Sequence, residues 1–342
     1  LLHTPLCRQG DAFTLRYTPQ EPGLYYYGFR LSDGTLLHRA PDGSADYGEG
    51  QLWQLTVYDK AYDIPQKFAG QVMYQIFPDR FFDCGIAEGN MMVVAAGVST
   101  CGYIPFASTF AMFAAGRAYE QVRNTVGYPH LNVKICATHG GISVGEDGAS
   151  HQCCEDFALM RTIPGMVVMC PSDDVEARAA VRAALEYEGP VYIRFGRAAV
   201  PVINDHPGYH FEIGKGTVVR EGKDVTIVAT GICVDSALGA AKMLEEEGIS
   251  AEVVNICTIK PLDEEIILNS AKKTGKVVTV EEHSVIGGLG SAVCDCLCAN
   301  HPVPVKKVGM QDVFGESGSA AALVEKYGLD AKGVYKSVKE FL

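Results

Sequence analysis

The sequence predicts an α/β protein with two parallel or mixed-sheet α/β domains, preceded by a small β-sandwich-like segment. Three observations support this fold class. Aromatic, alternating runs separated by turn residues fill the chain up to residue 66. Beyond it, short apolar runs alternate with helix-like segments, which is typical of parallel sheets covered by helices on both faces. A polar stretch, 203–216, then separates domain 67–205 from domain 215–342.

The N-terminal segment, 1–66, consists of strand-like runs joined by turns. Residues 13–17 alternate in polarity, residues 23–31 are rich in aromatics, and residues 52–58 form a further strand. Asp33-Gly34 lies between two such runs and is a strong hairpin signal.

The two α/β domains are predicted from their own alternation of elements. In the first, we expect helices at 90–98 and 155–163 and strands at 132–138, 166–171 and 190–195. Ser172 and Asp173 are candidate caps of the helix that follows. In the second, we expect helices at 236–247 and from 287 on, and strands at 224–231, 251–257, 276–282 and, at an edge, 303–308.

Composition and charge exclude several classes of protein. The net charge of −12 disfavours nonspecific binding to nucleic acid or to anionic membranes, which requires basic patches. The apolar runs are far shorter than the roughly 20 residues of a membrane-spanning helix. The first residues do not resemble a secretory signal, so we expect a cytoplasmic protein.

The 12 cysteines are expected to be free thiols, and no metal site is expected. Cys294, Cys296 and Cys298 contain no pair with the spacing of a zinc site. On a helix, these side chains would point away from one another.

The stretch ATHGGISVGEDGASHQ, 137–152, is the richest in chemistry. It leaves a strand and carries two histidines, His139 and His151, with Glu146 and Asp147 between them. In doubly wound sheets, ligands bind beyond the carboxyl ends of the strands, and glycines there allow close approach to a ligand. The alternative is a solvated surface loop.

Three motifs together resemble the C-terminal half of a transketolase. These are FFDCGIAEGNMM, STFAMF at 108–113 and the stretch 137–152, and the resemblance runs from about Phe77 to the C-terminus. Deoxyxylulose-phosphate synthases and the β subunits of 2-oxoacid dehydrogenases share this layout, but GEDG followed by SHQ favours transketolase. The resemblance implies a pyrimidine-binding domain, a C-terminal domain and thiamine diphosphate as cofactor.

The resemblance also implies a role for each matching residue. Glu88 would contact the aminopyrimidine ring of the cofactor and stabilise the tautomer that activates it. The alternative for Glu88 is a carboxylate at a helix start. Phe110 and Phe113 would pack against the pyrimidine ring, although their spacing of three also fits the buried face of a helix. The next aromatic of that row is replaced by Gly116.

The substrate side is implied in the same way. His139 and His151 would lie near the thiazolium and the sugar, where histidine suits proton transfer. Asp147 would bind a substrate hydroxyl, and Arg197 would bind the sugar phosphate. Arg194 is expected to face another way along its strand. Glu281, Glu282 and His283 are expected to be interface or structural residues, with an anion site at the following helix start as the alternative.

The resemblance implies a transferase component that moves a two-carbon ketol unit between sugar phosphates, as in the pentose phosphate pathway. The chain contains no GDG motif, with which the family holds the diphosphate and its Mg or Ca ion. We therefore expect a split subunit that needs a transketolase N-terminal subunit, forms a homo- or hetero-oligomer and is inactive alone.

The chain up to about residue 81 resembles the N-terminus of an α-amylase-family glycosidase. FPDRF, 77–81, is common to both families, so a crossover there predicts a chimera. Two further hypotheses follow: a carbohydrate-binding protein and a nonfunctional chimera. Trp53 and the tyrosines at 25–27 are candidate sugar contacts, with core packing as the alternative.

Overall fold

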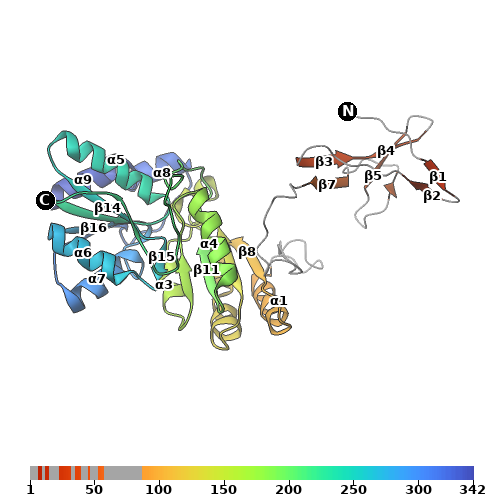
Figure 1. Ribbon diagram of the computed structural model, residues 1–342, viewed down its shortest axis with the longest axis horizontal. Coiled ribbons are helices and arrows are strands. Elements are labelled where there is room, and N and C mark those ends of the chain that lie inside the picture. The colour runs from red at the N-terminus through yellow and green to blue at the C-terminus, as the bar shows by residue number, and fades with distance from the viewer. Residues whose placement is uncertain are drawn as a thin grey trace. The chain divides into compact units, whose positions relative to one another are not determined.

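The computed structural model describes residues 87–342 and six short stretches nearer the N-terminus: 7–9, 12–14, 23–31, 35–39, 45–46 and 53–57. The chain divides into two compact units, Leu1–Ala69 and Gly70–Leu342, which are described separately (Figure 1). The FPDRF motif, 77–81, which is common to the two families, lies outside the described residues.

The N-terminal unit contains short antiparallel strands. Its strands are β1 (Cys7–Gln9), β2 (Ala12–Thr14), β3 (Gly23–Tyr27), β4 (Phe29–Arg30), β5 (Leu36–Arg39), β6 (Ala45–Asp46) and β7 (Trp53–Val57). Strand β1 pairs with β2, β3 pairs with β7, and β4, β5 and β6 form a third small sheet. The antiparallel pair β4 and β5 flanks Asp33-Gly34, as the hairpin signal predicts. The side chains of Tyr25, Tyr26 and Trp53 lie outside the description.

The first α/β domain is built on a five-stranded sheet of order β15-β10-β11-β9-β8. Its strands are β8 (Phe106–Phe110), β9 (Lys134–Thr138), β10 (Val167–Met169), β11 (Val191–Arg194) and β15 (Thr258–Lys260). The first four are mutually parallel, and β15 joins antiparallel to β10 from far along the chain. The helical segments are α1 (Glu88–Thr100), η3 (Met112–Arg117), α2 (Tyr119–Gln121), η4 (Val122–Gly127), η5 (Ile142–Asp147), α3 (Asp156–Arg161) and α4 (Asp174–Glu186).

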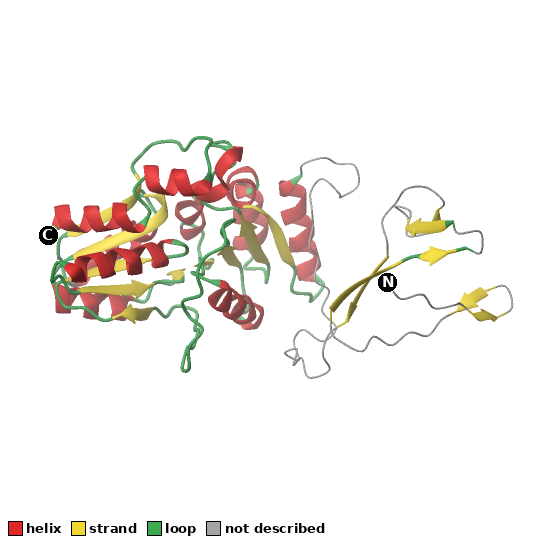
Figure 2. Ribbon diagram, turned by 90° about the horizontal axis from the view of Figure 1, so that it is seen from above, coloured by secondary structure: helices red, strands yellow, loops and turns green. Residues whose placement is uncertain are grey.

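The second α/β domain has a sheet of order β12-β14-β13-β16-β17. Its strands are β12 (Thr217–Arg220), β13 (Val225–Ala229), β14 (Ala251–Asn255), β16 (Val277–Ser284) and β17 (Val305–Met310), of which only β12 runs antiparallel to its neighbour. Its helices are α5 (Cys233–Glu246), α6 (Glu264–Thr274), α7 (Leu289–Asn300), α8 (Ala320–Lys326) and α9 (Ala331–Phe341). Both sheets are mixed and covered by helices, which confirms the predicted fold class (Figure 2).

Local chemistry explains where these elements begin and end. Asp173 accepts a hydrogen bond from the Glu176 amide and caps α4, as its position before the helix predicts. Asp263 caps α6 in the same way, and Gly275 ends that helix in the left-handed conformation that glycine adopts freely. Every residue of β13 and β14 is buried, because helices cover both faces of the sheet.

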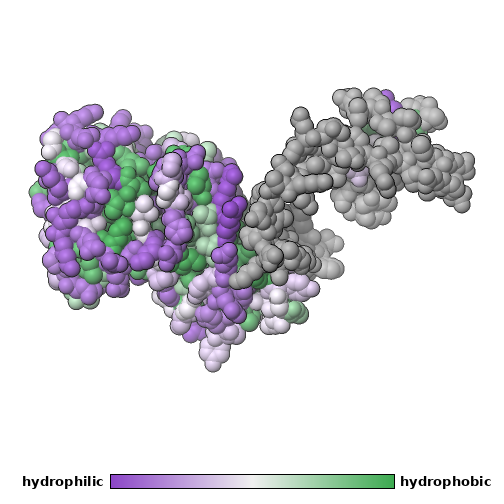
Figure 3. All heavy atoms as spheres, viewed as in Figure 1, coloured by the Kyte–Doolittle hydropathy of each residue, from purple (hydrophilic) through white to green (hydrophobic). Residues whose placement is uncertain are grey.

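On the face of the second unit that Figure 3 shows, hydrophilic side chains are prominent, with hydrophobic residues visible in bands between them. Among the described residues, none of the helices has the length and apolar character that crossing a membrane requires. The cysteines from Cys101 to Cys298 are all free thiols, as predicted. Burial raises the pKa of the Cys136 thiol to about 12, so this group is protonated at neutral pH.

Candidate functional site

The predicted chemical groups gather beyond the carboxyl ends of β8, β9 and β11. These three strands are adjacent and parallel, so their ends meet at one edge of the sheet. Phe110 is the last residue of β8, and His139 directly follows β9. His139 adopts a left-handed backbone conformation with a φ of 56°, which is uncommon outside glycine and frequent at functional sites.

Four rings form one cluster at this edge. The Phe110 and His139 rings stack at 3.9 Å between centroids with 9° between planes. The Phe113 ring lies parallel to that of Phe110 at 5.8 Å. The His151 ring meets both phenylalanines edge-on, at 6.3 Å from Phe110 and 5.3 Å from Phe113. The fold therefore brings together four of the predicted residues from β8, η3 and the glycine-rich loop.

Glu88 joins this cluster through Arg117. Glu88 begins α1 and is 1% exposed, and its Oε2 accepts a hydrogen bond from Arg117 Nη1 at 2.9 Å. The Arg117 guanidinium lies over the Phe113 ring, 4.4 Å from its centroid, in cation–π geometry. Arg117 is not among the site residues predicted from the sequence. The signal available was its spacing of four from Phe113, which places both on one helical face.

Gly116 lies against the side chain of Met112. A Cβ at this position would lie 2.3 Å from Cε of Met112, so a larger residue requires Met112 to move. Arg117 covers the Phe113 ring in this region.

Asp147 and Arg197 form a second group beside the rings. Arg197 Nη1 lies 3.6 Å from carboxylate oxygens of Glu146 and Asp147 and donates to the Val144 carbonyl. The three charged side chains are well exposed, so water screens these ion pairs and each contributes little to stability. Burial and the nearby Arg197 lower the pKa of His139, with Asp147 opposing them, so the imidazole is neutral at pH 7.

Arg194 lies elsewhere, as its place on the strand predicts. It is 2% exposed, and its Nη1 lies 3.6 Å from Asp156 while its Nη2 donates to the Glu282 carbonyl at 2.8 Å. Its guanidinium also packs on the Phe157 ring at 4.6 Å. Asp156 accepts a hydrogen bond from Tyr192 Oη at 2.8 Å. This buried ionic cluster links the two sheets.

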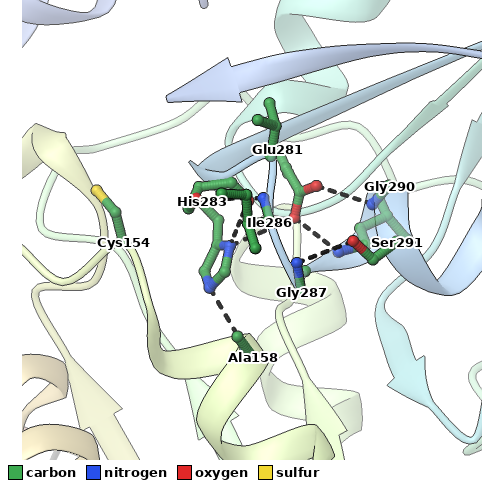
Figure 4. A network of polar contacts seen from close by, with 12 residues as sticks. Cys154, Ala158, Glu281, His283, Ile286, Gly287, Gly290 and Ser291 are labelled. Carbon is green, nitrogen blue, oxygen red and sulfur yellow. Dashed lines mark hydrogen bonds and ion pairs between the residues drawn. The ribbon is translucent and has the colours of Figure 1, made fainter. Parts of the chain in front are cut away.

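Glu281 and His283 are structural within the chain. The Glu281 carboxylate accepts from the amides of Leu289 and Gly290, at 2.6 and 2.8 Å, at the start of α7 (Figure 4). It thus takes the place that an anion would occupy at this helix start. His283 accepts from the Ala158 amide at 3.4 Å and stacks on Phe157 at 4.9 Å.

Two family models match the chain. The transketolase pyrimidine-binding domain matches residues 42–202, and the transketolase C-terminal domain matches residues 214–334. The first match begins within the N-terminal unit, ahead of the pyrimidine domain expected at 67–205.

Relatives and a solved structure show the same similarity. A chain of Methanocaldococcus jannaschii named as a transketolase C-terminal section is 52% identical over 266 residues, covering 77% of this chain and 83% of that one. A 6-deoxy-6-sulfo-D-fructose transketolase subunit of Clostridium sp. is 48% identical, covering 78% and 82%. A split-gene transketolase, solved as an inactive beta4 tetramer, is 59% identical with a TM-score of 0.69, covering 77% and 84%. The chain belongs to the transketolase family.

Proposed function

We propose that this chain is the C-terminal subunit of a split transketolase, transferring a two-carbon ketol unit between sugar phosphates together with an N-terminal subunit. The observation that carries the proposal is the cluster of Phe110, Phe113, His139 and His151 at the carboxyl edge of one sheet, with Glu88 attached through Arg117. Aromatic faces beside a buried acid suit a flat, nitrogen-containing ring.

The residues present fit the pyrimidine end of thiamine diphosphate. Glu88 is buried and its charge is balanced by Arg117, so it is held in place to receive a hydrogen bond from a ring nitrogen. Phe110 and Phe113 are half-buried and keep part of their rings accessible. When bound, the cofactor supplies the electron sink for cleaving and forming the carbon–carbon bond. In this proposal, the N-terminal subunit holds the diphosphate and its Mg or Ca ion.

The substrate groups have distinct tasks in this proposal. His139 is neutral at pH 7 and can accept a proton from a sugar hydroxyl at its ring nitrogen. His151, which meets the Phe113 ring edge-on, can donate a proton to the carbonyl oxygen. Asp147 accepts a hydrogen bond from a sugar hydroxyl, and Arg197 exchanges its carboxylate partners for the terminal anion of the substrate.

The terminal anion of the proposed substrate is a phosphate or a sulfonate. A guanidinium binds phosphate and sulfonate alike through oxygen atoms. The Clostridium relative is named for a sulfonated sugar, so both classes are candidates here. With phosphate, the enzyme would serve a cytoplasmic pentose phosphate route.

The test is a ketol-transfer assay in three parallel arms: this chain alone, the N-terminal subunit of a split transketolase alone, and their equimolar mixture. Each arm receives thiamine diphosphate, Mg²⁺, and either xylulose 5-phosphate with ribose 5-phosphate or 6-deoxy-6-sulfofructose with an aldose phosphate acceptor. Activity confined to the mixture supports the proposal. A mixture that forms a complex yet transfers no ketol unit from either donor refutes it.

The N-terminal unit carries a separate proposal. We infer that residues 1–66 form a β segment of glycosidase origin, joined near 77–81 to domains 67–205 and 215–342 of transketolase type. The match to the transketolase pyrimidine-binding domain begins at residue 42, within this segment, and so favours this origin only for the residues ahead of it. Tyr27 is 45% exposed and packs edge-on against Phe29, with 5.9 Å between the ring centroids. Retention of the chain on an amylose or maltodextrin column tests the carbohydrate-binding alternative, and sequencing genomic DNA across the join tests the chimera.

A further inference from the structure

The loop that carries the substrate groups is held by the second α/β domain. The Ser143 amide, in η5, donates a hydrogen bond of 2.6 Å to Oε1 of Glu282, at the end of β16. Glu282 is 5% exposed, so this contact is shielded from water and its geometry is fixed. The two residues are 139 positions apart and lie in different domains.

Arg194 fixes the position of Glu282. Its Nη2 donates to the Glu282 carbonyl at 2.8 Å and lies 3.4 Å from Oε2. Gly141 has a φ of +77°, and a Cβ there would lie 2.2 Å from Cδ of Glu282 and 2.3 Å from Nη2 of Arg194. The loop backbone therefore rests directly on this ion pair, in a space that only glycine fits.

Gln152 makes a second connection at the other end of the loop. Its Nε2 donates to the Ile142 carbonyl at 3.2 Å and to the Glu316 carbonyl at 2.9 Å. Glu316 lies in the segment before α8 of the second domain. A Cβ on Gly148 would lie 2.5 Å from Oγ of Ser317, so the loop and this segment are closely packed.

The held segment leads directly to the substrate side chains. Asp147 is the last residue of η5, and the Val144 carbonyl accepts from Arg197. We propose that Glu282 is a positioning residue, through which the C-terminal domain fixes the substrate-handling loop 142–147. The role of loop 142–147 in handling substrate rests on the proposed function, whereas the positioning of the loop by Glu282 does not. In this proposal, the second domain contributes to substrate binding by holding the loop in position.

The test compares Glu282→Ala, Glu282→Gln and Glu281→Ala with the wild-type chain. Glu281 is the matched control, since it is also buried and accepts two backbone amides, but at the start of α7 (Figure 4). Amide hydrogen exchange on the isolated chain reports the loop directly. A hydrogen bond to a charged group contributes about 1.5–3 kcal/mol, so Glu282→Ala should speed exchange at 143–147 about 10- to 100-fold.

Glu282→Gln keeps an acceptor for the Ser143 amide and should restore most of the protection. Glu281→Ala should affect the start of α7 and leave 143–147 unchanged. Wild-type exchange at 143–147 in both Glu282 variants would overturn the proposal, and so would equal acceleration by Glu281→Ala.

A kinetic arm with the N-terminal subunit separates positioning from general stability. Glu282→Ala should raise KM for the donor sugar about tenfold or more, while the affinity for thiamine diphosphate stays within about twofold. If Glu282→Ala weakened the affinity for thiamine diphosphate by the same factor as it raised KM for the donor sugar, the proposal would be overturned. Because the exchange arm needs no partner or cofactor, failure of the wild-type mixture to transfer ketol units would count against the proposed function alone.

Discussion

Replacing Arg194 by Met should destabilise the second unit by about 3–5 kcal/mol at pH 7.5. Arg194 is 2% exposed and lies 3.6 Å from Asp156 and 3.4 Å from Glu282. Each pair is attractive by about 5 kcal/mol at an effective dielectric constant of 20, offset by the cost of burying the three charges. Methionine fills most of the volume, so the loss comes from two carboxylates left without their cation.

The loss of stability caused by Arg194→Met should increase as the pH rises. Burial already raises the pKa of Glu282 above the ordinary value of 4.5 for a glutamate, and Arg194 is the largest influence opposing that rise. Without Arg194, the pKa rises further. When the pKa of a carboxyl group is higher in the folded than in the unfolded chain, the folded chain holds the proton more tightly. The stabilising contribution of that proton to the free energy of unfolding is fully present below pH 4.5 and is lost as the pH rises through the folded-state pKa. The variant should therefore lose more stability at pH 7.5 than at pH 5.

Urea unfolding of both proteins at pH 5 and pH 7.5, followed by far-ultraviolet circular dichroism, measures this difference. Arg178→Met is the matched control, because Arg178 pairs with Asp174 on an exposed helix face at 3.0 Å and should cost at most about 0.5 kcal/mol. A loss below about 1 kcal/mol for Arg194→Met, or a loss independent of pH, would refute the reasoning.

Three further changes probe the site. Arg117→Met removes the ion pair to Glu88 and should weaken thiamine diphosphate binding to the mixed enzyme about tenfold, measured by calorimetry, whereas unchanged affinity would deny Arg117 that role. Phe110→Leu removes the ring stacked on His139. It should lower the free energy of unfolding in urea by about 0.5–1.5 kcal/mol more than the loss of buried apolar area alone explains, and no such additional loss would contradict the stacking. Arg197→Gln should raise the pKa of His139, since Arg197 adds to the lowering caused by burial. A histidine titration by NMR that shows no rise would exclude that coupling.

Much of the fold follows from local sequence patterns. Strands β9, β13, β14 and β16 were predictable because each contains a short apolar run, as is typical of strands covered on both faces. The structure adds three strands that were not predicted from the sequence, β8, β12 and β15. Strand β12 is half-buried at a sheet edge, and β15 is three residues long and completes the sheet of the other domain. Its pairing is set by tertiary contacts that no local pattern encodes.

The site residues that lie in sequence motifs were predictable, whereas the contacts between residues far apart in the sequence were not. Phe110 and Phe113 have helical spacing, yet Phe110 ends β8 and only Phe113 lies in η3, so their stacking depends on the turn between them. Arg117 and Glu282 act across 29 and 139 positions of sequence. Such contacts exist only once the sheets are assembled.

The most direct test of the account is the effect of Glu88→Gln on ketol transfer by this chain mixed with a transketolase N-terminal subunit. Glu120→Gln, on the neighbouring α2 and exposed, is the control. The account predicts that Glu88→Gln lowers kcat about 100-fold or more, as expected for loss of a group that assists proton transfer, while Glu120→Gln behaves as wild type. Activity of Glu88→Gln within about threefold of wild type would contradict the assignment of this edge of the sheet as the cofactor site.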